Sequence, residues 1–263
     1  MELQGRRVLI TGASRGIGEA LAERFASAGS TVALVARTKD AIETTAARLG
    51  GTAHVADLSD PEQVANLIGR VEEEAGPIDV LVNNAGNGMP AGLADAPDDI
   101  LRMTTEVCYL APAELCRQVI PRMLRRGGGH IVNVSSMAGT SVAPGLVSYS
   151  AAKAALSHFT AGLRTDFRGL PLGTTLVELG PVRTDMLAQA DDYEPTGKSV
   201  ARFYRLRMFV AVPREKVAAD VVNAVRNGKR HVRLPKRCAA MGMIVEVPRR
   251  TTELLLTGVP HQP

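Results

Sequence analysis

Tyr149 and Lys153 stand four residues apart in the stretch SYSAAK, a spacing that places both side chains on one face of an α-helix. A phenol has an ordinary pKa of about 10, too high for ready proton exchange at neutral pH, and a neighbouring cation can lower that pKa by roughly 1–3 units. The pair is therefore a candidate acid/base site. Taken alone, the spacing is more typical of a solvated helix face, so its meaning depends on what surrounds it.

Two further polar segments follow apolar runs that are typical of β-strands. Ser135-Ser136 follows the run 130–134, and Asn83-Asn84-Ala85-Gly86 follows the run 80–82. Ligands bind at the carboxyl ends of parallel strands in open α/β sheets. We therefore expect these two segments and the Tyr149 helix to surround one ligand.

A glycine-rich loop lies between the first predicted strand and the first predicted helix. Its residues are Thr11-Gly12-Ala13-Ser14-Arg15-Gly16-Ile17-Gly18. Glycines allow a tight turn and close backbone approach, and a helix N-terminus presents unpaired N–H groups to a pyrophosphate. One glycine-rich turn is weak support by itself. Its position nevertheless predicts a dinucleotide site, with Gly12, Ser14, Arg15, Gly16, Ile17 and Gly18 as candidate contacts.

The residues that end the second and third predicted strands indicate which dinucleotide is bound. An acidic side chain at the end of the second strand can hold a ribose 2′-hydroxyl, but this chain has Arg37 there, and Arg15 can approach the same place. Guanidinium groups suit a 2′-phosphate, so NADP(H) is favoured over NAD(H). Asp57, after the third strand, is a candidate adenine contact or a turn residue before Asp60.

The alternation of short β-rich runs with helical patterns predicts the fold. The predicted strands are 7–10, 31–36, 52–56, 80–82, 130–134 and 174–179. Several are nearly continuous apolar runs, as expected when helices cover both faces of a parallel sheet. We therefore expect an α/β, doubly wound sheet. Asp60-Pro61 has the form of an N-cap followed by proline and predicts a helix that leads to Val71 and stops at Gly76-Pro77.

Length and composition are those of an ordinary globular protein. The 263 residues favour one domain over 1–263, and 45% hydrophobic with 22% charged residues is ordinary for a soluble protein. No apolar run is long enough to span a membrane, and the start leaves no room for a signal peptide, so a cytoplasmic location is expected.

The net charge of +4 is dispersed and no nucleic-acid motif accompanies it. The three cysteines lack metal-ligand spacing, so we expect thiols and no metal.

The later part of the chain contains a lid-like segment and an apolar tail. The segment from about 185 to 213 is irregular, yet it holds Tyr193, Phe203, Tyr204 and Phe209. These side chains could line a pocket or pack on the core. The tail from about 236 to 263 carries two short apolar runs, which could extend the pocket, mediate self-association or contact a membrane surface peripherally. Packing against the domain or a sister subunit is favoured for the tail.

Four motifs occur in order: T-G-x-x-x-G-I-G, N-N-A-G, a serine thirteen positions before the tyrosine, and Y-x-x-x-K. Through them the sequence resembles the short-chain dehydrogenase/reductase family over about residues 5–235. The resemblance implies a seven-stranded Rossmann sheet and hydride transfer between a nicotinamide and a carbonyl or alcohol. It also implies that Tyr149 is the general acid/base, Ser136 binds the substrate oxygen and Lys153 holds the nicotinamide ribose. Further cofactor contacts implied by the motifs are Asn84, Gly86, Val182 and Thr184.

One residue departs from the family pattern at the expected site. Cys108 stands where the family commonly places an asparagine that completes a water-linked proton relay to the lysine. A thiol is a poor substitute for an amide in hydrogen bonding, although the backbone carbonyl of Cys108 could still hold the relay water. We expect a working but slower relay. The alternatives are that Cys108 only fills helix space or acts as a redox-sensing thiol.

The expected substrate is a lipophilic carbonyl or secondary alcohol, such as a steroid, retinoid or long acyl chain. A runner-up function is reduction of 3-oxoacyl groups on a carrier protein, docked on Arg122, Arg125 and Arg126. From another class, the chain could be a weakly catalytic NADP-binding scaffold or redox sensor. The family resemblance further implies a homodimer or homotetramer formed through the long helices that contain Cys116 and Tyr149.

Overall fold

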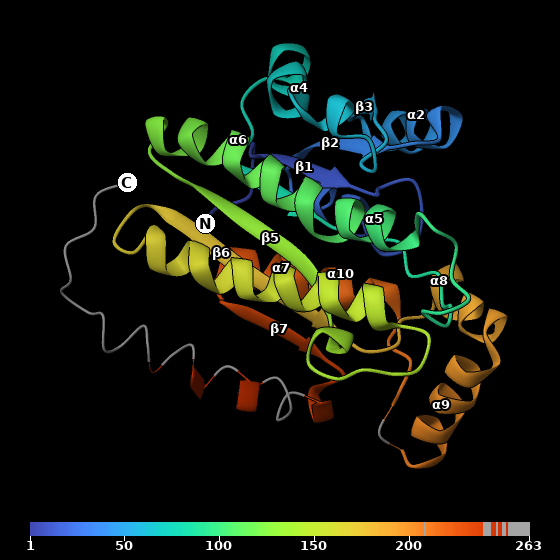
Figure 1. The fold of residues 1–263 in the computed structure, drawn as a ribbon. Helices are drawn as coiled ribbons and strands as arrows, with labels where there is room; N and C mark the ends of the chain where they lie inside the picture. Colours follow the sequence, from blue (N-terminus) through green and yellow to red (C-terminus); the bar gives the residue numbers. More distant parts are fainter. Residues whose placement is uncertain (208, 239–242, 246, 249–250, 252–263) are drawn as a thin grey trace.

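The computed structural model describes residues 1–207, 209–238, 243–245, 247–248 and 251. Within them, one sheet of seven parallel strands runs through the centre of the molecule in the order β3-β2-β1-β4-β5-β6-β7 (Figure 1). The strands are β1 (Arg7–Thr11), β2 (Thr31–Ala36), β3 (Thr52–Val55), β4 (Val80–Asn83), β5 (Gly129–Ser136), β6 (Leu172–Leu179) and β7 (His231–Leu234). The predicted doubly wound sheet is confirmed, and the seventh strand is the one that the family resemblance adds to the six predicted runs.

The strand order reverses between β1 and β4, and this reversal determines where a ligand can bind. Val8 of β1 pairs with Val32 of β2 on one side and with Val80 of β4 on the other. The chain therefore leaves β1 toward β2 and later returns past it to β4. In open α/β sheets the loops diverge at such a switch point and leave a crevice beyond the carboxyl ends of the strands.

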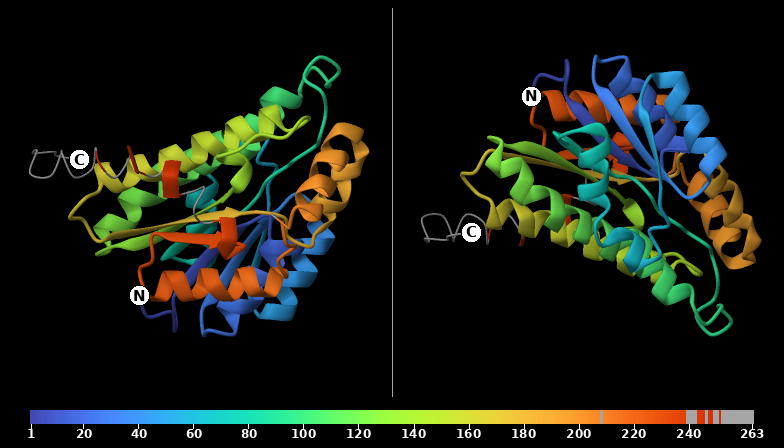
Figure 2. Two further views of the ribbon diagram at one scale, coloured as in Figure 1. Left: turned by 90° about the horizontal axis from the view of Figure 1, so that it is seen from below. Right: turned by 90° about the horizontal axis from the view of Figure 1, so that it is seen from above.

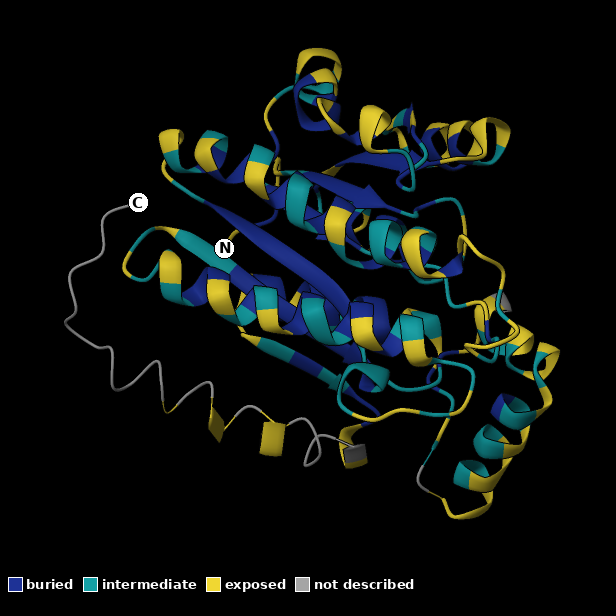
Figure 3. Cartoon of the chain, in the orientation of Figure 1, coloured by how far each residue is buried: buried dark blue, intermediate teal, exposed yellow. Residues whose placement is uncertain are grey.

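Helices cover both faces of the sheet (Figure 2). On one face pack α1 (Gly16–Ala26), α2 (Lys39–Leu49) and α10 (Arg214–Arg226), and on the other α4 (Leu67–Ala75), α6 (Ala111–Arg125) and α7 (Val147–Asp166). Side chains of a strand alternate between these faces, so Leu34 belongs to the first core and Val35 to the second. The central strands β1, β4 and β5 are accordingly almost wholly buried (Figure 3), whereas the edge strands β3 and β7 include residues that are only partly buried or exposed.

Two local predictions need adjustment. Asp60 caps a helix as expected, since its Oδ1 accepts from Glu62 N at 2.9 Å, but that helix is short: α3 (Pro61–Val64) ends before Asn66, and α4 begins anew. Ser135 and Ser136 lie within β5 rather than after it, because both still pair with β6. The serine side chains are therefore held by a sheet strand and not by a loop.

The lid-like segment 185–213 folds into α8 (Asp185–Ala188) and α9 (Glu194–Arg205), in so far as it is described. A parallel bridge between Val182 and Val212 closes the base of this segment. Most of the predicted tail, 236–263, lies outside the described residues. Among the residues that the structure describes, none of the helices has the length and apolarity that crossing a membrane requires.

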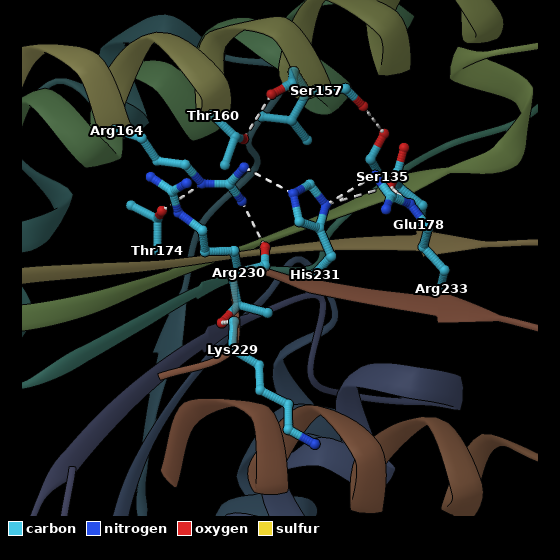
Figure 4. Close-up of polar contacts among 12 residues, drawn as sticks. Ser135, Ser157, Thr160, Arg164, Thr174, Glu178, Lys229, Arg230, His231 and Arg233 are labelled. Atoms are coloured by element: carbon cyan, nitrogen blue, oxygen red, sulfur yellow. Dashed lines mark hydrogen bonds and ion pairs between the residues drawn. The ribbon is translucent and has the colours of Figure 1, made fainter. Parts of the chain in front are cut away.

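A buried polar network fastens the edge strand β7 to α7 (Figure 4). Glu178 of β6 accepts from Arg233 Nε at 2.5 Å, and Arg164 of α7 contacts His231 Nε2 at 3.0 Å and donates to the carbonyl of Arg230. Burial alone would raise the pKa of Glu178, but hydrogen bonds from His231 and Arg233 outweigh it and hold the pKa below its usual value. The carboxylate is therefore charged, and α7 is fixed at its C-terminal end.

Candidate active site

Lys153 is buried at the centre of the site, with 4% of its surface exposed. Its Nζ donates to the main-chain oxygen of Val134 at 2.9 Å, so the ammonium is tied to β5. The ring of Tyr149 lies on the same helix face, with its centroid 5.8 Å from Nζ. The predicted pair therefore does converge, with Tyr149 half-buried at the pocket and Lys153 behind it.

Ser135 of β5 and Ser157 of α7 fasten the helix to the strand (Figure 4). Ser135 Oγ donates to the carbonyl of Lys153 at 2.9 Å, Ser157 Oγ reaches the same carbonyl at 2.9 Å, and the two hydroxyls lie 2.8 Å apart. All three residues are buried. The lysine is thus held to β5 by its main chain as well as by its ammonium group.

Ser136 joins Tyr149 in the pocket. Its hydroxyl donates to the carbonyl of Leu179 at 3.3 Å and accepts from Ala138 N at 3.1 Å, which fixes its direction. Burial raises the pKa of Tyr149 above its usual value, a thiolate at Cys108 would raise it further, and a hydrogen bond with Ser136 lowers it in part. Contrary to the lowering expected from Lys153, the net shift of this pKa is upward, because desolvation of the buried phenol is the largest effect. The phenol therefore holds its proton at neutral pH.

Cys108 lies in a π-helical turn, Glu106–Leu110, between α5 (Ile100–Thr105) and α6. It is fully buried, and its Sγ lies 3.5 Å from both the carbonyl oxygen and Oδ1 of Asn87. Short π-helical turns inside α-helices are frequent at functional sites. The thiol of Cys108 thus has hydrogen-bonding partners beside the site. A residue that only filled space in the helix would not need them.

The glycine loop fits the backbone of a dinucleotide. Gly12 has φ +65°, and a Cβ there would lie 2.9 Å from Ala85 Cα; a Cβ on Gly18 would lie 2.1 Å from the carbonyl oxygen of Gly12. No side chain can replace hydrogen at either position without moving backbone. The loop is also held from β4, since Asn84 Nδ2 donates to the carbonyls of Thr11 and Gly12 at 2.9 and 3.2 Å. Asn84 therefore positions the loop.

The other loop residues stand around the N-terminus of α1. Arg15 precedes the helix in extended backbone, and Gly16 begins it with φ +61°. Ser14 and Ile17 occupy the same turn, and Ile17 lines the pocket. The loop amides Gly12 N and Ala13 N both donate to the carbonyl of Val35, so the loop runs beside the end of β2, where Arg37 is exposed. Arg37 and the loop that contains Arg15 thus lie at one corner of the site.

The remaining predicted contacts divide into two groups. Val182 and Thr184 line the pocket, and a Cβ on Gly16 would lie 3.5 Å from Thr184 Cγ2, so this turn faces the glycine loop. By contrast, Oδ1 of Asp57 accepts hydrogen bonds from the main-chain N of Ser59 at 2.9 Å and from the Ser59 hydroxyl at 2.7 Å. The turn interpretation describes this carboxylate, which leaves its other oxygen as the group that could meet an adenine.

The pocket at the carboxyl ends of the strands has a volume of about 230 Å³. Ser136, Tyr149 and Lys153 contribute polar groups to its lining, and the other polar side chains there are Asn84, Ser135, Ser141, Thr184 and Thr196. Much of the remaining wall is apolar, and a large part of it comes from the loop after β5 and from the 185–213 segment, including Met137, Leu146, Met186, Val200, Phe203 and Phe209. Sequence motifs did not identify these wall residues, because the apolar side chains of a pocket wall follow no fixed sequence motif. The aromatic content of the 185–213 segment was the available indication.

The segment 185–213 is docked against two other loops. Thr196 Oγ1 donates to the carbonyl of Pro144 at 2.6 Å, and a Cβ on Gly145 would lie 2.5 Å from the ring of Tyr193. Ala91 N donates in turn to the carbonyl of Gly145 at 3.0 Å. The three segments therefore pack together, and each contributes residues to the pocket lining.

The arginines suggested for carrier docking lie elsewhere. Arg122 and Arg126 both pair with Glu72, each at 3.0 Å, near the C-terminal end of α6. That end leads into the start of β5, while the pocket lies at the other end of the strands, as Figure 1 shows. A carrier protein docked there would lie at the opposite end of the strands from the pocket, so the geometry gives no support to that docking site.

Comparison with known proteins agrees with this geometry. The family model of the short chain dehydrogenases matches residues 6–195. A Mycobacterium tuberculosis protein named fatty acyl-CoA reductase is 36% identical over 242 residues, which cover 86% of this chain and 82% of that protein. Mouse 17-beta-hydroxysteroid dehydrogenase 13 is 33% identical over 236 residues, 88% of this chain and 74% of the relative.

Solved structures give the same result over nearly the whole chain. A short-chain dehydrogenase from Sphingobium yanoikuyae in complex with NADPH superposes with a TM-score of 0.80 at 26% identity, covering 98% of both chains. A Burkholderia phymatum enzyme in complex with NAD gives 0.77 at 25% identity, covering 100% of this chain and 99% of that chain.

The fold and the site thus define a dinucleotide-dependent oxidoreductase. The chain belongs to the short-chain dehydrogenase family, and its cofactor is a nicotinamide dinucleotide.

Proposed function

We propose that this enzyme interconverts a lipophilic carbonyl compound and its secondary alcohol, with NADP(H) as the preferred cofactor. The observation that carries the proposal is that Ser136, Tyr149 and Lys153 share a pocket whose lining is otherwise largely apolar. Such a pocket aligns one oxygen and encloses a hydrocarbon body.

The three polar side chains have separate roles in this proposal. The nicotinamide supplies or accepts the hydride when bound. Tyr149, which holds its proton at neutral pH, donates it to the substrate oxygen during reduction. Ser136, fixed by Leu179 and Ala138, donates a hydrogen bond to the same oxygen as negative charge develops there. Lys153 leaves the carbonyl of Val134 to bind the nicotinamide ribose and to favour the tyrosinate.

The NADP(H) preference rests on the corner formed by Arg15 and Arg37. Arg15 lies in the glycine loop, whose Gly12 and Ala13 amides donate to the carbonyl of Val35. Arg37 follows Val35 by two residues and is exposed at the end of β2. A guanidinium pairs with a 2′-phosphate, whereas the ribose hydroxyl of NAD(H) needs an acceptor. We expect Arg37→Asp to reverse the preference by about tenfold to a hundredfold in kcat/KM. Equal efficiency of the unaltered enzyme with both cofactors would overturn the assignment.

The lipophilic substrate class is supported by the pocket wall and by relatives of similar type. Phe203, Val200 and Met186 are among the apolar side chains of that wall. The two relatives are named for acyl-CoA and for steroid chemistry, so a keto- or hydroxysteroid and a long-chain acyl substrate are the two classes to compare first. Nicotinamide absorbance would measure turnover of both beside small polar sugars. Higher kcat/KM with the sugars would contradict the proposal.

We also propose that the enzyme self-associates through α6 and α7. A broad groove on their outer faces is lined largely by apolar side chains, among them Leu110, Ile120, Phe159 and Phe167, and Leu110 is 42% exposed. A second copy of the same face would cover this surface. Light scattering should give a dimer or tetramer for the unaltered chain and a smaller species for Phe159→Glu; an unchanged mass in both would contradict the assignment of this face.

A further inference from the structure

The thiol of Cys108 and the side chain of Asn87 meet beside Lys153. Cys108 Sγ lies 3.5 Å from the carbonyl oxygen of Asn87 and 3.5 Å from its Oδ1. A thiol has a single proton, so it donates to one of these oxygens at a time. In either case the contact ties the loop after β4 to the π-helical turn, and the bond to Oδ1 also orients the carboxamide.

The glycines on either side of Asn87 bring its backbone close to both reacting groups. A Cβ on Gly86 would lie 3.5 Å from Lys153 Nζ and 3.8 Å from Cys108 Sγ, and a Cβ on Gly88 would lie 3.7 Å from Tyr149 Cδ2. Lys153 and Cys108 are buried, whereas Asn87 is only half-buried. Asn87 is therefore a partly exposed polar residue in the loop that passes the buried lysine.

The proposed function requires such a route. In each reduction the O–H bond of Tyr149 breaks and its proton passes to the substrate oxygen, while the hydride goes to the carbonyl carbon. The tyrosinate then takes a proton from the Lys153 ammonium, which becomes a neutral amine. Lys153 is 4% exposed, so its proton must be replaced from solvent through an ordered polar group.

We propose that Asn87 is the positioning residue for this proton supply. Cys108 holds its carboxamide in place, and the carboxamide orders the water from which Lys153 is reprotonated. A thiol alone is a weak hydrogen-bonding group, so in this chain the two side chains together take over what one amide at position 108 would do. The inference rests on the proposed function and adds Asn87 to it.

Steady-state turnover in H₂O and D₂O, measured across pH with NADPH and one good substrate, tests the inference. Asn87→Ala should lower kcat about tenfold and raise the solvent isotope effect, with KM values changed less than about twofold, because binding is untouched and proton supply becomes limiting. Cys108→Ala should act in the same way, and the double variant should be no slower than either. Cys108→Ser, which keeps a donor, should stay close to the unaltered enzyme. The exposed Asn223→Ala on α10 is the matched control.

A second amide gives the sharpest comparison. In a Cys108→Asn background the cost of Asn87→Ala should fall below about twofold, because the new amide takes over the role. The inference is overturned if Asn87→Ala keeps the kcat, isotope effect and pH profile of the unaltered enzyme, or if its effect persists in the Cys108→Asn background. Tyr149→Phe distinguishes failure of the proposed function from failure of the inference. Full turnover of Tyr149→Phe would contradict the proposed function itself. Loss of turnover in Tyr149→Phe together with normal turnover in Asn87→Ala would contradict only the inference.

Discussion

The ammonium of Lys153 donates a hydrogen bond to the main-chain oxygen of Val134, two residues before Ser136 on the same strand. The cation that α7 contributes and the hydroxyl that β5 contributes are therefore held by one strand. Ser135 also donates to the main-chain carbonyl of Lys153. The distance between Ser136 and Lys153 in the pocket is therefore set by the contact between α7 and β5.

Lys153→Met keeps the length of the side chain and removes its charge. We expect turnover to fall by at least about a hundredfold and NADPH binding to weaken, because both the ribose and the tyrosinate lose their cation. The unpaired Val134 carbonyl should cost about 1 kcal/mol of unfolding free energy. Fluorescence titration with NADPH and thermal unfolding would measure the two effects. Unaltered turnover would exclude a role for this cation.

Gly18→Ala places a methyl group 2.1 Å from the carbonyl oxygen of Gly12 and must move the loop. We expect NADPH binding to weaken by about a hundredfold or more, since the helix N-terminus no longer approaches the phosphates. Gly162→Ala on α7 is the matched control, because its Cβ would meet nothing within 4 Å. That variant should bind NADPH normally and gain up to about 1 kcal/mol of stability. Equal binding by both variants would contradict the proposed cradle.

Ser157→Ala removes one of the two hydroxyls that fasten α7 to β5. The buried hydroxyl of Ser135 then loses a partner, so we expect about 1–2 kcal/mol of destabilisation and a lower kcat with little change in substrate KM. Urea unfolding and steady-state kinetics would check both. A stability loss with unaltered kcat would show that the serine pair supports the fold without setting the position of Lys153.

Burial lowers the pKa of His130 to about 4, while the unfolded chain should have a value near 6.5. As pH falls below about 6.5 the unfolded chain takes up the proton first, so stability is fully present above that pH and declines until about pH 4, by about 3 kcal/mol at most. His130→Gln can keep a hydrogen bond to Thr175 and does not titrate. Its unfolding free energy should vary less between pH 7 and pH 4; an identical slope would contradict the assignment.

The sequence by itself determined the parts that depend on local pattern. Alternation of apolar runs with helical periods predicted the parallel sheet, because each run records the burial of its own faces. Gly12, Gly16 and Gly18 indicated the dinucleotide loop, because positive φ and close approach allow few other residues. The spacing of Tyr149 and Lys153 predicted one shared helix face. The short, basic strand β7 escaped this pattern and was expected from family resemblance alone.

Tertiary structure decided whatever depends on contacts between distant segments. It turned the oxygen Oδ1 of Asp57 toward Ser59, paired Arg122 with Glu72 far from the pocket, and brought Asn87 to Cys108. It also decided that the pKa of Tyr149 rises, since desolvation depends on everything packed around the ring and not on the lysine one turn away. Spacing along a chain fixes which side chains share an element, but burial and partners arise only where elements meet.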